Sequence, residues 1–332
     1  MSRVTIRDVA ELADVSVATV SAVINRNKYV SPELKRRVER AIDQLGYRRD
    51  LVARSLRIKE TKTIGLIFTN ITSPIWPPLV RAAQKVAQQA GFDTFLVTTD
   101  EDGEREKTSL SSLLAKQVDG ILITPASSEG YEHIREASRS IPIIAIERKV
   151  PGVECVITNN GEITRQAVNH LIDHGYERIG LVTIPLLGSN IGERIEGYRR
   201  TLREHDLYDP DLVREADFVG DTAFDLALDL ISIKGVDAIF TTSQSTAMGV
   251  LRAANQLGCR VPDDLALFGY DDVPWMEVVA SPLSTIRQPA QEMATLATEL
   301  LLERLEGREP SGAAMHMLES SLVIRCSCGC CE

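Results

Sequence analysis

The apolar residues of the first 46 positions recur every three or four residues, in three short stretches. This spacing places them on one face of a helix, so each stretch is predicted to be amphipathic and helical. The three helices together are expected to enclose one small core. The apolar positions are Ile6, Val9, Ala10 and Ala13 in the first stretch, Val20, Val23 and Ile24 in the second, and Leu34, Val38, Ala41, Ile42 and Leu45 in the third.

Polar residues mark where these helices begin and end. Thr5, with Asp8 three residues later, is a predicted capping box in which Asp replaces the usual Glu or Gln. Ser16 is a predicted cap of the second helix. Ser31, followed by a proline, begins the third helix, and Gly46 ends it. The short turn between the first two helices predicts a helix-turn-helix, although a three-helix bundle without a DNA role fits the pattern equally well.

Beyond residue 62, short β-branched runs alternate with helical stretches. The runs are "TIGLIF", "DTFLVTT", "GILIT" and "IPIIAI", followed by "RIGLVT", "DAIFTT" and "DLALFG". This alternation is typical of βαβ units and a parallel sheet. The runs fall into two sets, separated near residues 158–162, which predicts two doubly wound lobes. Such folds bind ligands outside the carboxyl ends of their strands, so a ligand is expected in the crevice between the lobes.

Charge is unevenly distributed along the chain. Residues 1–62 carry 14 Lys and Arg against 8 Asp and Glu, a formal charge of +6, whereas the rest carries 23 basic against 39 acidic residues, a charge of −16. Phosphate attraction acts over about 8–10 Å at ordinary salt, so a basic head can bind nucleic acid independently of an acidic body. A solvated basic surface is the alternative explanation.

Composition places the chain among ordinary globular proteins, with 332 residues, 44% of them hydrophobic and 25% charged. No apolar run approaches 18 residues, and the polar N-terminus lacks the apolar core of a signal peptide, so a cytoplasmic location is expected. The tail "CSCGCCE" holds four of the six cysteines without the usual spacing of a structural zinc site. We interpret it as a flexible, oxidation-prone terminus; binding of a soft metal is the alternative.

The sequence lacks the common signatures of an enzyme. There is no G-x-G-x-x-G, Walker A, G-x-S-x-G or H-E-x-x-H pattern. His170 and His174 are four residues apart, but "HLIDH" lacks the glutamate of a metalloprotease. We therefore expect no catalytic residues, no metal and no cofactor. A transport-type binding protein is a closer alternative for the body alone, although the basic head argues against it.

Several segments in series resemble one family. "TIRDVAELADVSVATVSAVIN", "YVSPELKRRVERAIDQLGY" and "ARSLR" resemble the head of the lactose-repressor/purine-repressor family of bacterial transcription factors. "TIGLIFTNI", "DGILITP", "IPIIAIER", "HLIDHGYERIGLV", "RIEGYRRTL", "DLALFGYDDVP", "SPLSTIRQP" and "SLVIR" then follow in the family's order. Such an ordered set is far more specific than any single segment.

The resemblance implies an N-terminal all-α helix-turn-helix head with a hinge helix, followed by a two-lobed α/β body. The body would have doubly wound parallel sheets and resemble periplasmic binding proteins, with the chain crossing between the lobes three times. The expected head spans 1–49, the hinge helix and linker 50–62, and the body 63–332. Within the body, the first lobe would comprise about 63–161 plus 290–318, and the second about 162–289 plus 319–332.

The same resemblance implies how the head contacts double-stranded DNA. The second helix enters the major groove, with bases read by Val17, Ala18 and Ala22. The hinge helix places Leu56 as a wedge in the minor groove, near the cations Arg54 and Arg57. Phosphates are contacted by Ser16, Thr19, Ser21, Asn25 and Tyr47, and the hydroxyl of Thr5 is a further candidate.

One departure weakens the expected base readout. Relatives often carry a long polar residue, commonly Arg, where this chain has Ala22. Val17, Ala18 and Ala22 offer bases only apolar contact, for example with thymine methyl groups. Discrimination is therefore expected to depend on half-site spacing and on the deformability of the step that Leu56 opens. Readout by Ser21 or by the backbone is the alternative.

For the effector, the resemblance implies contacts from both lobes. The matched positions are Ile75, Trp76, Asn160, Arg194, Phe218, Ser243 and Asp271. Structural roles are the alternative: Trp76 as lobe core, and Arg194 with Asp271 as an ion pair between the lobes. Many sugar-responsive relatives have Asn-Asp where this chain has Ser243-Gln244, which removes a strong acceptor for sugar hydroxyls. A sugar acid, a modified sugar or another metabolite therefore stays open.

We predict a ligand-responsive, sequence-specific transcription regulator, a repressor that binds a palindromic operator as a homodimer. A small metabolite, a sugar or sugar derivative, would bind between the lobes. The alternatives are a corepressor-dependent regulator of non-sugar metabolism and a cytoplasmic small-molecule binding protein without specific DNA readout. No sustained heptad repeat indicates a tetramer. Whether the effector is an inducer or a corepressor stays open.

Overall fold

The computed structural model describes residues 4–25, 28–47, 60–127, 129–186, 188–217, 221–308 and 314–330. Contacts divide the chain into two compact units, residues 1–61 and 62–332. The expected hinge helix, with Arg54, Leu56 and Arg57, lies outside the described residues, as does Phe218.

The head consists of the three expected helices, α1 (Ile6–Ala13), α2 (Val17–Asn25) and α3 (Pro32–Leu45). The Thr5–Asp8 capping box is present, Ser16 Oγ accepts from Thr19 N, and Ser31 Oγ accepts from Leu34 N. Gly46 ends α3 in the left-handed region, at φ 61°, which glycine adopts without a steric penalty. The predicted caps are therefore confirmed. The fully buried core of the head is formed by Val9, Ala10, Ala13, Val20, Val38 and Ala41.

An arginine from α3 fixes the turn between α1 and α2. Arg37 Nε donates to the carbonyl oxygen of Ala13, and its Nη2 donates to the carbonyl and the carboxylate of Asp14 at 3.0 and 2.9 Å. These carbonyls lie at the end of α1, where they lack partners within the helix. Arg37 thus supplies the missing donors and ties α3 to the end of α1.

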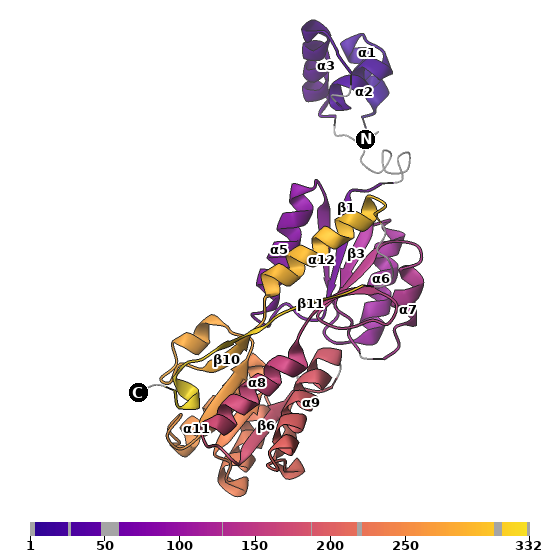
Figure 1. Cartoon of the computed structure of the whole chain (residues 1–332). Helices are drawn as coiled ribbons and strands as arrows, with labels where there is room; N and C mark the ends of the chain where they lie inside the picture. Colours follow the sequence, from indigo (N-terminus) through magenta and orange to yellow (C-terminus); the bar gives the residue numbers. More distant parts are fainter. Residues whose placement is uncertain are drawn as a thin grey trace. The chain divides into compact units, whose positions relative to one another are not determined.

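The body contains two six-stranded sheets (Figure 1). The first has the order β11-β5-β4-β3-β1-β2, and all its neighbouring strands are parallel. Its strands are β1 (Thr63–Phe68), β2 (Asp93–Thr98), β3 (Gly120–Ile123), β4 (Ile143–Ile146), β5 (Glu154–Thr158) and β11 (Met315–Leu318).

The second sheet has the order β12-β10-β9-β8-β6-β7. Its strands are β6 (Ile179–Thr183), β7 (Val213–Glu215), β8 (Ala238–Thr241), β9 (Ala266–Tyr270), β10 (Ser284–Arg287) and β12 (Ser321–Val323). All neighbours are parallel except β12, which pairs antiparallel with β10. This edge strand is the one departure, among the described residues, from the parallel sheets that the sequence predicts; an antiparallel edge strand is common on such sheets.

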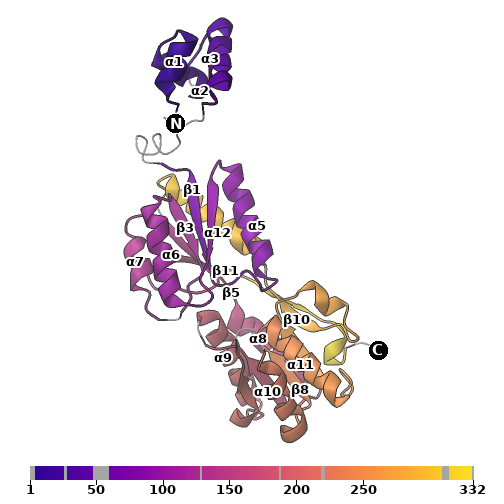
Figure 2. The same ribbon diagram turned by 180° about the vertical axis from the view of Figure 1, so that it is seen from behind.

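Helices cover both faces of each sheet, and alternate strand residues enter separate cores. On the first sheet, α5 (Trp76–Gln89) and α12 (Ala290–Leu305) pack on one face, and α6 (Gly103–Ala115) and α7 (Glu132–Ala137) on the other (Figure 2). On the second, α8 (Asn160–Asp173) and α9 (Ser189–Glu204) pack opposite α10 (Ala223–Asp229) and α11 (Gln244–Leu257). The short helices are η1 (Pro210–Leu212), η2 (Leu230–Lys234), η3 (Pro274–Glu277) and η4 (Cys326–Cys328).

The chain passes between the two sheets three times, after β5, after β10 and after β11. The doubly wound, two-lobed architecture therefore agrees with the sequence analysis, while the exact lobe boundaries stay a prediction. Within the described ranges, no helix has both the length and the apolar character needed to cross a lipid bilayer.

The described part of the C-terminal tail is folded, which corrects the expectation of a flexible terminus. Ser327 and Cys328 of η4 are fully buried. Ser327 Oγ donates to the carbonyl of Leu267 at 2.6 Å and accepts from Ser284 N at 2.7 Å. These bonds attach the tail to β9 and β10, so it forms part of the second lobe.

Candidate functional site

A cavity of about 170 Å³ lies between the two sheets, lined by residues that follow their strands. Glu147 and Arg148 follow β4, Ser243 follows β8, and Asp271 follows β9. This is the position expected for a ligand site in a doubly wound fold. Its volume is below the 300–1,000 Å³ that is typical of drug-sized ligands, so the cavity suits a small molecule.

Arg194 of α9 extends into this cavity from the second lobe and is only 2% exposed. Its Nε donates to Asn160 Oδ1 at 2.9 Å, and its Nη1 donates to the carbonyl of Thr242 at 2.8 Å. The guanidinium group also lies 3.6 Å from the ring centroid of Tyr270. These contacts hold the group rigid, while Nη2 makes no hydrogen bond to any described residue.

The carboxylate nearest to Arg194 comes from the other lobe. Glu147 Oε1 lies 3.7 Å from Arg194 Nη2 and accepts from Asn190 Nδ2 at 2.8 Å. Glu147 has a left-handed backbone, with φ 69°, directly after β4. Burial raises the pKa of its carboxyl group. Its Oε2 and Asn190 Oδ1 are buried without a hydrogen-bond partner among the described residues.

Asp271 does not pair with Arg194, so the expected alternative of an ion pair between these two is wrong. Its Oδ1 accepts from Gln288 Nε2 at 2.7 Å, and the side chain is 7% exposed. Gln288 in turn accepts from Thr158 Oγ1, at the end of β5. Burial raises the pKa of Asp271. Both carboxylates have lost hydration, which hydrogen bonds from a ligand can replace.

Arg148 forms the wall of the first lobe. Its guanidinium group makes a bidentate pair with Glu101, at 2.6 and 2.8 Å, and donates to the carbonyl of Pro125. Its Nε is buried and has no partner among the described residues. The cavity thus presents fixed donors and acceptors from both lobes, an arrangement suited to a small polar ligand.

Of the other predicted effector residues that the structure describes, three line the cavity and one does not. Ile75 and Trp76 line the cavity, but Trp76 is 6% exposed and packs on Phe68 in the first-lobe core. Ser243 also lines it, while its hydroxyl caps α11. Asn160 does not line it and instead accepts from Arg194 Nε and the Tyr270 hydroxyl. Asn160 is therefore placed to position Arg194 rather than to contact a ligand.

The predicted DNA-contact residues of the head differ in exposure. Val17 is 42% exposed and Ala18 is exposed, whereas Ala22 is only 9% exposed. Ala22 therefore offers little surface to a base. Thr5 and Ser16 are exposed, Thr19, Ser21 and Tyr47 are half-buried, and Asn25 is the last residue of α2. The hydroxyls of Thr5 and Ser16 serve as helix caps.

Comparisons with known proteins give one family match for the head and another for the body. The model for bacterial regulatory proteins of the lacI family matches residues 5–50, and that for a periplasmic binding protein-like domain matches residues 168–328. A ribose operon repressor from Halalkalibacterium halodurans is 34% identical over 325 residues, which cover 97% of this chain and 96% of that protein.

The chain belongs to the LacI family. A second relative, the transcriptional repressor PurR of Aliivibrio salmonicida, is 32% identical over 92% of this chain and 93% of its own length. The structure of a Lac repressor dimer bound to operator and the anti-inducer ONPF matches with a TM-score of 0.87 and 27% identity, over 98% of this chain and 99% of the other. Family membership confirms the predictions of a DNA-binding transcription regulator and of a chain that is not an enzyme.

Several cavity residues of this LacI-family chain were not predicted from its sequence. Glu147, Arg148 and Asn190 line the cavity, and Gln288 holds Asp271. The signal for the first two was available, because "IPIIAIER" ends a buried strand at the edge where ligands bind. Gln288 carried the same signal, because it directly follows β10, whereas Asn190 lies in the first turn of α9 and carried none.

Proposed function

We propose that this LacI-family regulator is a repressor that binds a sugar or sugar derivative in the cavity between its lobes. The observation that carries the proposal is a set of buried polar atoms that find no hydrogen-bond partner among the described residues: Arg194 Nη2, Arg148 Nε, Glu147 Oε2 and Asn190 Oδ1. A buried polar group without a hydrogen bond costs about 1–3 kcal/mol. A small ligand with several hydroxyl groups can satisfy donors and acceptors together, which an apolar ligand cannot.

The proposed effector contacts are Ile75, Trp76, Arg194, Ser243 and Asp271. Phe218 is included because the family resemblance implies it. Asn160 is proposed to position Arg194 rather than to contact the effector. Arg194 would donate to adjacent ligand oxygens, and Asp271 would accept from a hydroxyl. Glu147 and Asn190, both beside Arg194, are added to this set. Together these residues come from both lobes, so a bound ligand links them directly.

Ligand binding is proposed to act through contacts that already join the lobes beside the cavity. Lys149 Nζ lies 2.5 Å from Glu193 Oε1, and Lys149 N donates to Ser189 Oγ at 3.0 Å. Both partners belong to α9, the helix that carries Arg194. A ligand that changes the position of α9 therefore changes the lobe angle, and coupling of this kind is usually about 1–3 kcal/mol.

On the DNA side, we propose that a cytoplasmic homodimer binds a palindromic operator. Val17 and Ala18 would contact bases, and Thr5, Ser16, Thr19, Ser21, Asn25 and Tyr47 would face phosphates. Ala22 would add little. Arg54, Leu56 and Arg57 are assigned to the minor groove by the resemblance alone. The dimeric Lac repressor bound to operator, which is similar over 98% of this chain, supports this assembly.

A purine-type corepressor is the second candidate, favoured by the similarity to PurR. Isothermal titration calorimetry of the full chain with a panel of pentoses, hexoses, sugar acids and purine bases separates the two. We expect one sugar to bind, and Arg194→Lys to weaken it by at least about tenfold, because lysine cannot reproduce the planar donor fork. Arg200→Lys, on the exposed face of the same helix, is the matched control. Binding of a purine alone would contradict the sugar proposal.

A further inference from the structure

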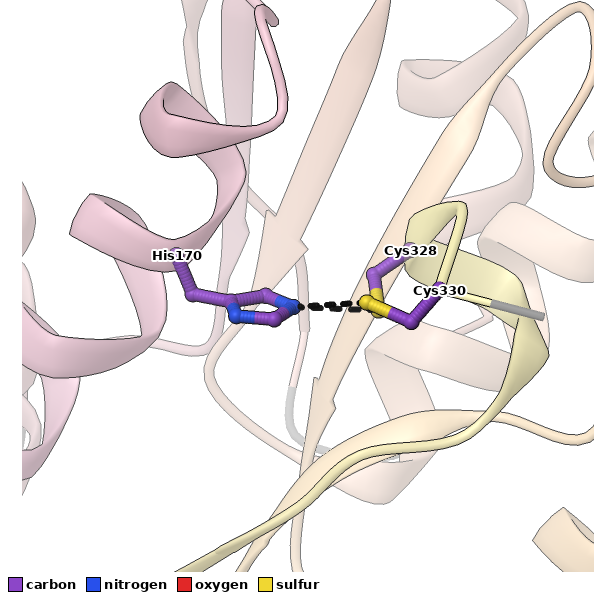
Figure 3. Close-up of side chains that lie close together, drawn as sticks. All are labelled: His170, Cys328 and Cys330. Atoms are coloured by element: carbon purple, nitrogen blue, oxygen red, sulfur yellow. Dashed lines mark hydrogen bonds between the residues drawn. The ribbon is translucent and has the colours of Figure 1, made fainter. Parts of the chain in front are cut away.

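Three side chains of types that can ligate a metal, one from α8 and two from the C-terminal tail, meet on the second lobe. The Nε2 atom of His170 lies 3.3 Å from Cys328 Sγ and 3.2 Å from Cys330 Sγ, and the two sulfur atoms lie 3.2 Å apart. All three atoms lie within 4.8 Å of one another. Figure 3 shows the imidazole of His170 pointing directly at the two sulfurs.

His174 supplies a fourth donor. It lies four residues after His170 on α8, so the two imidazoles share one helix face, with ring centroids 4.3 Å apart. Its Nε2 lies 3.1 Å from Cys330 Sγ. Its Nδ1 lies 2.7 Å from the carbonyl of His170, which orients the ring and leaves the Nε2 lone pair for a metal.

We propose that His170, His174, Cys328 and Cys330 bind one Zn²⁺ ion in a structural Cys₂His₂ site. Zinc–sulfur bonds of about 2.3 Å and zinc–nitrogen bonds of about 2.0–2.1 Å place tetrahedral ligand atoms roughly 3.3–3.8 Å apart. The contacts of 3.1–3.3 Å are close to this range for His170, Cys328 and Cys330, whose ligand atoms all lie within 4.8 Å of one another. The ring of His174, which approaches Cys330 Sγ, would move closer to the other ligands on binding.

The charge balance also favours zinc. Cys328 is fully buried, and an isolated thiolate there would be costly. Binding of Zn²⁺ by two thiols releases two protons and gives two thiolates, so with two neutral imidazoles the site has no net charge. Ser284 Oγ lies 3.0 Å from Cys328 Sγ, as a donor to the ligating sulfur.

The site joins segments that are about 160 residues apart in the sequence. The antiparallel strand β12 returns the chain beside β10, and η4 then brings the cysteines to α8. Because α8 begins with Asn160, which holds Arg194, the zinc ion would anchor the other end of a helix that supports the cavity. The proposed site departs from the sequence-based expectation that no metal is bound, and the experiment below decides between the two.

The test is zinc binding by the full chain, purified with a phosphine reductant and without chelator. We expect one tightly bound zinc per chain by elemental analysis. Cobalt(II) should give a thiolate-to-metal charge-transfer band and the visible absorption of a tetrahedral site. Cys330→Ser and His174→Ala change exposed side chains, so their folding is not at risk. Each should lower zinc affinity by at least about tenfold, since even outer-shell changes cost about 10–100-fold.

The matched controls are Cys259→Ser and His205→Ala, a free cysteine and an exposed histidine of the same lobe. Cys326→Ser is a third control, because Cys326 is not part of the proposed set. All three should retain zinc. Less than one zinc per chain in the wild type, binding of copper(I) but not zinc, or equal losses in variants and controls would overturn the proposal.

Discussion

At the scale of single residues, the cavity is lined by charged side chains that are buried from solvent. Arg194 is fixed by Asn160, Thr242 and Tyr270, and Glu147 and Asp271 have raised carboxyl pKa values because they are buried. Such groups are costly to the ligand-free protein. A ligand that accepts from Arg194 and donates to the two carboxylates would recover this cost, so on the proposed function these residues favour binding over stability.

The first prediction concerns Asp271→Asn in the ligand-free protein. Because the folded pKa of Asp271 is raised above its unfolded value of about 3.9, its contribution to stability is greatest below pH 4. That contribution is lost as the pH rises through the folded pKa. Asparagine keeps the acceptor for Gln288 without the buried charge. The variant should therefore be more stable than the wild type at pH 7, and this advantage should shrink as the pH falls.

Urea denaturation of both proteins between pH 4 and 8 measures this difference directly. The comparison cancels ionisable groups that the two proteins share. An advantage that does not depend on pH would show that the pKa of Asp271 is not raised on folding, and a variant less stable at pH 7 would show that its carboxylate is stabilised by its surroundings.

A second prediction at this scale concerns Leu56, whose wedge role is implied by the resemblance alone. A side chain inserted at one base step contributes only where that step deforms easily. Leu56→Ala should therefore weaken binding to a specific operator more than binding to a random duplex. Leu51→Ala, in the same segment, is the control. Electrophoretic mobility shifts measure the loss of affinity for each duplex. Equal losses for the operator and the random duplex would show that Leu56 does not act as a wedge.

At the scale of elements, the packing of α8 on α9 positions the cavity. A Cβ atom at Gly197 would lie 2.6 Å from the carbonyl oxygen of Gly161 and 3.0 Å from Thr164 Cβ. The two helices therefore approach each other at glycines. This close approach places Asn160, at the start of α8, beside Arg194 on α9.

Gly197→Ala should destabilise the body by about 1–3 kcal/mol, because the added methyl group meets backbone that cannot yield. Gly192→Ala on the same helix is the matched control: its Cβ would contact only the exposed Leu186 side chain, at 3.1 Å. Since alanine favours a helix over glycine by about 0.5–1 kcal/mol, that variant should be neutral or stabilised. Thermal melts compare the two, and the opposite order would refute the packing argument.

Helix ends could be predicted from the sequence more reliably than the positions of the side chains that line the cavity. The caps at Thr5, Ser16, Ser31 and Gly46 depend on local chemistry, and the structure confirms them. The place of Glu147 after a buried strand was readable from the sequence, but the direction of its side chain was not, because that direction depends on a left-handed backbone after β4.

The Cys₂His₂ cluster was hidden for a different reason. "HLIDH" and "CSCGC" each lack the spacing of a known metal site, and only the antiparallel return of β12 brings them together. Local patterns therefore predicted local structure, whereas contacts between distant segments required the topology.

At the scale of the whole molecule, the charge distribution separates two tasks. The basic first 62 residues are attracted to phosphates, while the acidic remainder is repelled by DNA and contains the cavity proposed for the effector. Regulation requires a coupling free energy between effector binding in the body and operator binding by the head. This coupling is reciprocal, so the effector and the operator change each other's affinity by the same factor.

The central claim is tested most directly by fluorescence anisotropy. A duplex selected from a random pool is titrated with the full chain, with and without each sugar, at two salt concentrations. We predict that one sugar changes affinity for the selected duplex by about 5–150-fold, corresponding to 1–3 kcal/mol, while affinity for a random duplex is unchanged. Loss of this change in Asp271→Ala would assign it to the cavity. No selected duplex, or an equal effect of every sugar on both duplexes, would contradict the account.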